Sequence, residues 1–312
     1  MTRILALAVA SAFGVSAHAA TTVTRYDIHV ENGKRAGEQV VERDDDGATR
    51  VRYIFKDNGR GPELTEQFRV AADGTISQYS VKGNSTYGAV VDEQFERSGV
   101  QASGRSTSEK GSKAVNGAAL YVPLNSSFEV ASVAITALAA RPGASMPLLP
   151  SGTLSHRKLD EVDVIAGGKT QKVQLLAQTG IGMSPQFYWA TTGDKPRLFA
   201  VVIPGYMTMT EQGWSEVGKT LAARQKLSES KMLIDLAARL QHPLKGLTVV
   251  RNARVFDSAK ATVGAPSDVY VLRGRITAVL PAGSPVRGAV NDIDAGGRIM
   301  LPGLFDMHGH VG

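Results

Sequence analysis

Residues 49–56 read Thr-Arg-Val-Arg-Tyr-Ile-Phe-Lys, and this short stretch decides the fold class. Side chains of a β-strand alternate between its two faces. Val51, Tyr53 and Phe55 therefore share one face, while basic side chains occupy the other. One apolar and one charged face is typical of an antiparallel sheet with one side in water. The stretch predicts a mainly β protein.

Further strands are predicted on both sides of this stretch. Short clusters rich in Asn, Asp and Gly separate them about every ten residues, which is the spacing of an antiparallel β-meander. Residues 98–117 are polar and rich in glycine and serine, and we expect a loop there. Residues 20–212 are predicted to form one large antiparallel domain that includes a short apolar helix at 128–140. The expected strands are 22–30, 35–43, 49–56, 64–71, 75–82, 89–97, 153–159, 170–177, 186–192 and 197–203.

The Asp44-Asp45-Asp46-Gly47 cluster offers an alternative to a turn, because acidic residues also line calcium loops. It lacks the alternating oxygen ligands and the late glutamate of such a loop. A hairpin turn is the better prediction.

The N-terminus has the pattern of a secretory signal peptide. Arg3 precedes a short apolar segment at 4–15, and Ala17-His18-Ala19 gives the small-x-small cleavage pattern. We expect residues 1–19 to be removed after Ala19 and the protein to be periplasmic or secreted. The segment is shorter than the ~20 apolar residues of a spanning helix, so no membrane span is expected.

Composition excludes several functional classes. The chain has no cysteine, which rules out disulfides, a thiolate nucleophile and a zinc–cysteine site. The net charge of +6 is scattered, without a basic stripe and interleaved aromatic residues, so nucleic-acid binding is not expected. No nucleophile elbow, phosphate loop or dinucleotide fingerprint occurs in the β-rich region.

A helical pattern at 214–241 is followed by a second group of short strands. Leu233, Ala237 and Leu240 form an apolar stripe, and His242-Pro243 ends it. We interpret 213–243 as a connecting helix between two domains. Strands are then predicted at 247–256, 268–272, 275–280, 290–293 and 298–301.

The last residues carry the candidate metal site. His308 and His310 are two positions apart, so on a strand both imidazoles point to the same side and can share an ion. A catalytic zinc ion normally takes three protein ligands and keeps one position open. Two histidines are therefore an incomplete site.

Residues 247–312 resemble the amidohydrolase superfamily in its imidazolonepropionase-like branch. The family's ordered motifs occur here with its spacings, and they end in Pro-Gly-Φ-Φ-Asp-x-His-x-His, where Φ is apolar. The matching residues are Asn252, Asp257, Asp268, Gly274-Arg275-Ile276, Ile293-Asp294-Ala295, Gly297 and residues 302–310.

The resemblance implies a fold and a chemistry. Residues 244–301 would form the family's small β-sandwich, and 302–312 would begin the first strand of a (β/α)8 barrel, truncated at Gly312. His308 and His310 would bind one or two divalent ions, most often zinc, and Asp306 would orient their turn. The family's other ligands and its catalytic aspartate come from later strands, so no catalytic residue is expected within this chain.

Two functions follow from the sequence. The first is an exported metal-dependent hydrolase that cleaves C–N bonds of a small amide or cyclic amide with metal-activated water, of which this chain is the N-terminal portion. The 312-residue chain alone is then expected to be inactive. The alternative is a non-catalytic exported β-domain protein that binds a ligand or partner and ends in a vestigial hydrolase segment.

Overall fold

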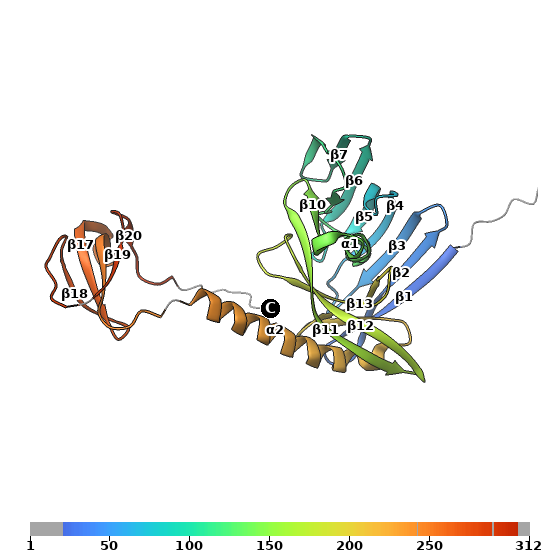
Figure 1. The fold of residues 1–312 in the computed structure, drawn as a ribbon. Coiled ribbons are helices and arrows are strands. Elements are labelled where there is room, and N and C mark those ends of the chain that lie inside the picture. The colour runs from blue at the N-terminus through green and yellow to red at the C-terminus, as the bar shows by residue number, and fades with distance from the viewer. Residues whose placement is uncertain (1–20, 242, 289, 305–312) are drawn as a thin grey trace, which may run out of the picture. The chain divides into compact units, whose positions relative to one another are not determined.

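The computed structural model describes residues 21–241, 243–288 and 290–304 (Figure 1). The protein is mainly β, as the alternating stretches predict. It forms two compact units that divide between Ser230 and Lys231, within the long helix α2 (Gly218–Leu240).

The large unit contains a single sheet of fifteen strands within the described residues. Its other elements are α1 (Glu129–Ala139), the short 3-10 helices η1 (Pro142–Ala144) and η2 (Ser215–Val217), and the part of α2 up to Ser230. The strands are β1 (Thr21–Val30), β2 (Arg35–Asp44), β3 (Ala48–Phe55), β4 (Glu63–Val70), β5 (Ile76–Asn84), β6 (Val90–Ser98), β7 (Gln101–Arg105), β8 (Lys110–Ala114), β9 (Leu120–Tyr121), β10 (Ser145–Leu149), β11 (Thr153–Ala166), β12 (Lys169–Thr179), β13 (Gln186–Thr191), β14 (Leu198–Ile203) and β15 (Met207–Glu211).

Two antiparallel meanders join to make this sheet. Strands β1 to β8 follow one another in space, and so do β10 to β15. The two runs meet where β1 pairs with β15, with Tyr26 opposite Glu211. The β9–β10 pair is parallel, and the other pairs of this sheet are antiparallel.

The prediction of a loop over 98–117 is wrong, because β7 and β8 form an edge hairpin there. Every residue of β8 is exposed, so the strand carries no buried apolar residue to produce an alternating pattern. The Asp44–Gly47 turn is a hairpin turn as predicted. Its carboxylates pair with arginines, Asp44 with Arg50 at 2.9 Å and Asp46 with Arg69 at 3.0 Å.

The main core lies on one face of the sheet. Val51, Tyr53 and Phe55 are buried there, and the residues between them are not. Helix α1 packs against this face through Ile135 and Leu138, which are both buried, and Figure 1 shows it lying against the strands.

A second core covers the opposite face of β11–β14. Trp189 and Phe199 lie in it together with Leu221 of α2. Gln225 of α2 accepts a hydrogen bond from Trp189 Nε1 at 3.1 Å and donates to the Val202 carbonyl at 3.0 Å. Coverage of both faces explains why β14 is an unbroken apolar run instead of an alternating strand.

The small unit is one mixed sheet, so the predicted β-sandwich is not what the described residues form. Strand β17 pairs antiparallel with β16 and β18, whereas β19 and β20 both pair parallel with β16. The register between β16 and β17 shifts twice, and β19 and β20 follow one another along the other edge of β16. Its strands are β16 (Thr248–Asp257), β17 (Thr262–Leu272), β18 (Arg275–Pro281), β19 (Asn291–Asp294) and β20 (Ile299–Met300).

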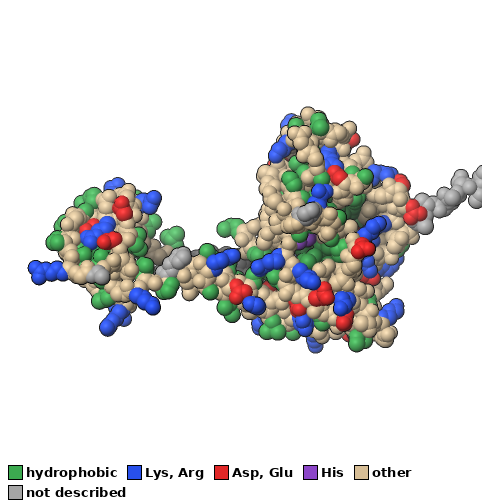
Figure 2. Space-filling model, viewed as in Figure 1, with side chains coloured by type: hydrophobic (Ala, Val, Ile, Leu, Met, Phe, Trp, Pro, Cys, Tyr) green, Lys and Arg blue, Asp and Glu red, His purple; other side chains and the backbone are tan. Residues whose placement is uncertain are grey.

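The described part of the chain contains no (β/α)8 barrel. Residues 302–304 follow β20 without helix or strand, and the rest of the predicted barrel strand lies outside the described residues. Neither described helix is both long and apolar enough to cross a bilayer. On the face of the large unit in Figure 2, basic and acidic side chains are interspersed.

Candidate functional site

The predicted metal ligands His308 and His310, and their predicted neighbour Asp306, lie outside the described residues. The signal peptide at 1–19 lies outside them as well. The described residues do not bring three His, Cys, Asp or Glu side chains together as a metal site would require. Metal binding by the histidine pair therefore stays a prediction.

The motif residues from Asn252 to Gly297 are described, and several of them have a structural role. Asp268 is 1% exposed, and its carboxylate accepts three hydrogen bonds. The donors are Asn252 N at 3.0 Å, Gly283 N at 3.0 Å and the Arg251 guanidinium at 2.8 Å. Burial raises the pKa of this carboxyl, but the three donors outweigh burial and hold the pKa below its usual value. A charged carboxylate with three fixed donors ties β16, β17 and the 283 turn together.

Asn252 occupies an irregular position in β16. Its φ of +53° is left-handed, which asparagine tolerates better than most residues, and it lies where the β16–β17 register shifts. Its carbonyl accepts a hydrogen bond from Gly297 N at 2.9 Å. Asp294 accepts one from Gly296 N at 2.7 Å. These contacts fix the turn between β19 and β20, which precedes Pro302.

Gly274 and Asp257 of the motif series also contribute to turns. Arg273 and Gly274 both have positive φ, +52° and +73°, as a two-residue hairpin turn requires. Asp257 accepts hydrogen bonds from the backbone of Ala259 and Lys260. The motif series thus defines the fold of the small unit, while any chemistry depends on the histidines that follow it.

Buried carboxylates in the large unit were missed by the sequence reasoning. Glu66 is fully buried and accepts hydrogen bonds from Ser127 N, from Ser127 Oγ at 2.6 Å and from Tyr79 Oη at 3.1 Å. Burial raises the pKa of Glu66 to about 7, although the Ser127 hydrogen bonds oppose the rise. Glu129, also buried, pairs with Arg43 at 2.5 Å. The sequence signal was present, because Glu66 stands at an apolar position between Leu64 and Phe68.

Glu93 has the same kind of position in β6. It is 2% exposed, and its carboxylate accepts hydrogen bonds from the Tyr121 hydroxyl and from Leu124 N. Together with Glu66 it anchors the segment 121–129 against the sheet. Glu66 and Glu93 have structural partners on both oxygens, so we assign them no catalytic role.

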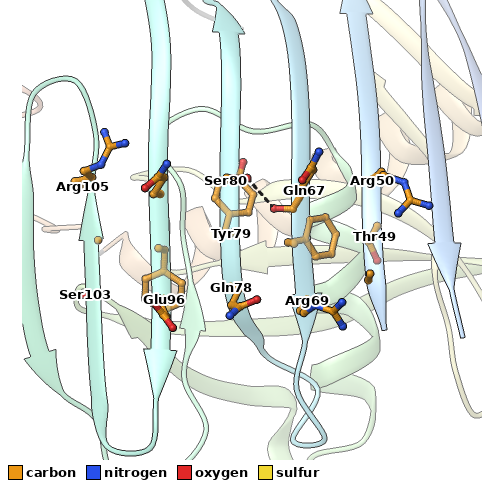
Figure 3. A pocket seen from close by; sticks show the side chains of 15 residues that line it. Thr49, Arg50, Gln67, Arg69, Gln78, Tyr79, Ser80, Glu96, Ser103 and Arg105 are labelled. Carbon is orange, nitrogen blue, oxygen red and sulfur yellow. Dashed lines mark hydrogen bonds between the residues drawn. The ribbon is translucent and has the colours of Figure 1, made fainter. Parts of the chain in front are cut away.

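An open groove of about 670 Å³ lies on the wet face of β3–β7. Figure 3 shows its polar side chains in rows that cross the strands. Arg50 and Arg105 lie at the two ends of one such row, and each has an acidic neighbour. Arg50 pairs with Asp44, and Arg105 lies 3.5 Å from Asp92, so the charges at both ends are balanced. This is the expected surface of a solvated sheet face. One row of cross-strand partners runs Arg50, Gln67, Ser80, Gln94 and Arg105.

A second cavity of about 380 Å³, here called the hairpin cavity, lies between the β7–β8 hairpin, residues 121–124 and residues 149–150. Phe95 and Tyr121 both line it, their rings stack on each other with centroids 4.0 Å apart, and this stacked pair is here called its floor. Its size falls within the range of small-molecule sites. The remaining lining residues include Ala102, Gly104, Arg105, Glu109, Lys110, Gly111, Lys113, Val122, Leu124, Leu149 and Pro150.

Comparison with known proteins gives partial similarities. No family model matches the chain. Stretches of 63 residues are 38% identical to an adenine deaminase of Chelativorans sp. (strain BNC1) and 43% identical to a dihydroorotase of Solibacter usitatus. A stretch of 82 residues is 35% identical to adenine deaminase 3 of Rhizobium johnstonii.

These matches cover 20–26% of this chain, and the chain spans only 10–14% of the length of the three enzymes. The chain thus contains a segment similar to enzymes of the amidohydrolase superfamily. Among solved structures, a beta-barrel-like protein of a domain of unknown function from Brucella abortus aligns with 61% of this chain and 94% of its own, at 11% identity and a TM-score of 0.39.

Proposed function

We propose that this chain belongs to an exported, metal-dependent hydrolase of C–N bonds and supplies the ligands His308 and His310. The observation that carries the proposal is the ordered motif series from Asn252 to Gly297, which leads directly to the histidine pair. The partial similarity to an adenine deaminase and a dihydroorotase supports it, because both named enzymes hydrolyse C–N bonds.

The histidines would hold a divalent ion, most often zinc, through neutral imidazole nitrogens. When bound, such an ion lowers the pKa of a coordinated water and polarises the bond to be cleaved. Asp306 would orient the turn that carries the imidazoles. The described residues of the small unit contribute to structure and not to chemistry. Asp268 and Asn252 fix the turns of the small sheet, and Pro302 follows its last strand.

The substrate class is a small molecule with an amide, cyclic amide or amidine C–N bond. The names of the similar enzymes suggest two test compounds, adenine and dihydroorotate. The protein expressed from its complete reading frame, with zinc supplied, should hydrolyse at least one member of a panel built on these two compounds. The double variant H308N/H310N should lose that activity. Hydrolysis that is equal in both proteins would refute the proposal.

Export by the segment at 1–19 is part of the same proposal. The mature protein recovered from the cell envelope or medium should begin at Ala20, which intact mass spectrometry measures. Recovery of the uncleaved chain from the cytoplasm would contradict export without affecting the hydrolase assignment.

A second candidate function is binding of a ligand by the large unit without catalysis. The hairpin cavity favours it, because it combines an aromatic floor with the basic side chain of Lys113 in a space of ligand size. The two functions are compatible in one protein.

A further inference from the structure

We propose that the hairpin cavity binds an amphiphilic carboxylate, with an aliphatic chain over the Phe95 and Tyr121 rings and the carboxylate on the ammonium of Lys113. This site lies wholly in the large unit and is independent of the proposed metal site.

The floor of the cavity is apolar and rigid. The Phe95 and Tyr121 rings are nearly parallel, with 6° between their planes. The hydroxyl of Tyr121 is bound to the buried Glu93 carboxylate, which also accepts from Leu124 N. The polar groups under the floor therefore have partners within the protein. Leu124, at the edge of the cavity, is 58% exposed. Such a floor favours an apolar ligand body.

Two residues of the hairpin that line the cavity are glycines, which place no side chain in it. Gly104 of β7 and Gly111 of β8 are direct cross-strand partners. Neither has the left-handed φ that would require glycine. A Cβ on Gly104 would lie 3.7 Å from Phe95 Cδ2 and 3.7 Å from Tyr121 Oη, which are ordinary contacts, and a Cβ on Gly111 would meet nothing within 4 Å. Glycine weakens a strand and often marks the close approach of a ligand or another backbone.

Lys113 and Gly111 are two residues apart in β8, so both face the cavity. Lys113 therefore places a positive charge on the cavity side of the strand. Its ammonium donates to the Pro150 carbonyl at 3.0 Å, which uses one of its three donors. A ligand carboxylate can take the other two.

One basic side chain faces the cavity. Lys113 shares the face of Gly111, whereas Arg105 and Lys110 alternate with Gly104 and Gly111 and direct their side chains to the opposite face of the hairpin. The acidic lining residues are Glu109 and Glu93, and Glu93 is 2% exposed beneath the floor. Arg105 also lies 3.5 Å from Asp92. An apolar floor under a cationic edge is complementary to a ligand with one anionic end.

The test is calorimetric titration of the 312-residue chain with decanoate, kept below its micelle concentration, and with 1-decanol. Wild type should bind one decanoate saturably. G111L should weaken binding at least tenfold, because its side chain fills the space above the rings. A114L is the control, since a leucine at this position lies on the opposite face of β8, points out of the cavity and should leave the affinity unchanged. Far-UV circular dichroism checks that each variant folds.

K113M separates the headgroup from the cavity and provides a second variant. Loss of a charge-assisted hydrogen bond should weaken decanoate binding about tenfold and leave 1-decanol binding unchanged. No saturable binding of decanoate by wild type would overturn the proposal. So would equal losses in G111L and A114L, or equal weakening of acid and alcohol by K113M.

Discussion

Replacing Glu66 by glutamine should remove a pH-dependent loss of stability from the large unit. Glu66 is fully buried against Ser127 and Tyr79, and burial raises the pKa of its carboxyl from 4.5 to about 7. Between these two values the folded protein keeps the proton that the unfolded chain releases. The contribution of Glu66 to the unfolding free energy is therefore fully present below pH 4.5 and decreases as the pH rises toward 7.

The size of the effect follows from the shift. Each pKa unit corresponds to about 1.4 kcal/mol, so a rise from 4.5 to about 7 costs roughly 3 kcal/mol once the pH exceeds 7. Glutamine does not titrate, and its amide can accept from Tyr79 while donating to Ser127 Oγ. The unfolding free energy of E66Q minus that of wild type should therefore increase by about 3 kcal/mol from pH 4 to pH 8.

Urea unfolding followed by tryptophan fluorescence measures this difference. The chain has two tryptophans, Trp189 and Trp214, and both lie in the large unit, so the signal reports that unit alone. Unfolding free energies of wild type and E66Q are compared at several pH values. Because other titrating groups such as Glu129 are present in both proteins, their contributions cancel in the difference. A difference that stays constant from pH 4 to pH 8 would refute the assigned burial of a titrating Glu66.

Further predictions concern turns and glycines. D268A leaves the backbone N–H groups of Asn252 and Gly283 without their acceptor and should destabilise the small unit by about 2–4 kcal/mol, whereas the surface-turn variant D257A should cost about 1 kcal/mol or less. Hydrogen exchange of β16 and β17 amides measures both, and equal protection in the two variants would contradict the role of Asp268. G274A should cost about 1 kcal/mol because its φ is +73°, whereas G111A, in extended backbone, should be neutral or slightly stabilising in urea unfolding. A neutral G274A would argue against the assigned turn.

Strands were predictable from the sequence where only one face of the sheet is buried. The alternation at 49–56 identified a strand whose apolar residues the structure buries, because each side chain's environment follows from the pleat. The same logic failed at β7 and β8, where an exposed edge hairpin lacks alternation. The pairing of β1 with β15 joins residues nearly two hundred positions apart, and no local pattern specifies such a partner.

The two candidate sites also differ in how far the sequence alone could predict them. A metal site at the histidine pair is predicted from its spacing and the motifs before it, and it stays a prediction because the pair lies outside the described residues. The hairpin cavity was not predictable, since it needs residues 121–124 to fold back over β6 and β7. Glycine at 104 and 111 suggested a loop in the sequence, and in the structure these residues leave space above an aromatic floor.

The central claim is that His308 and His310 hold a hydrolytic metal ion. The most direct measurement is metal content by mass spectrometry of the protein from its complete reading frame, purified without chelator, beside its H308N/H310N variant. The account predicts at least one zinc or other divalent ion per chain in wild type and its loss from the variant. Equal metal content in the two proteins would contradict the account.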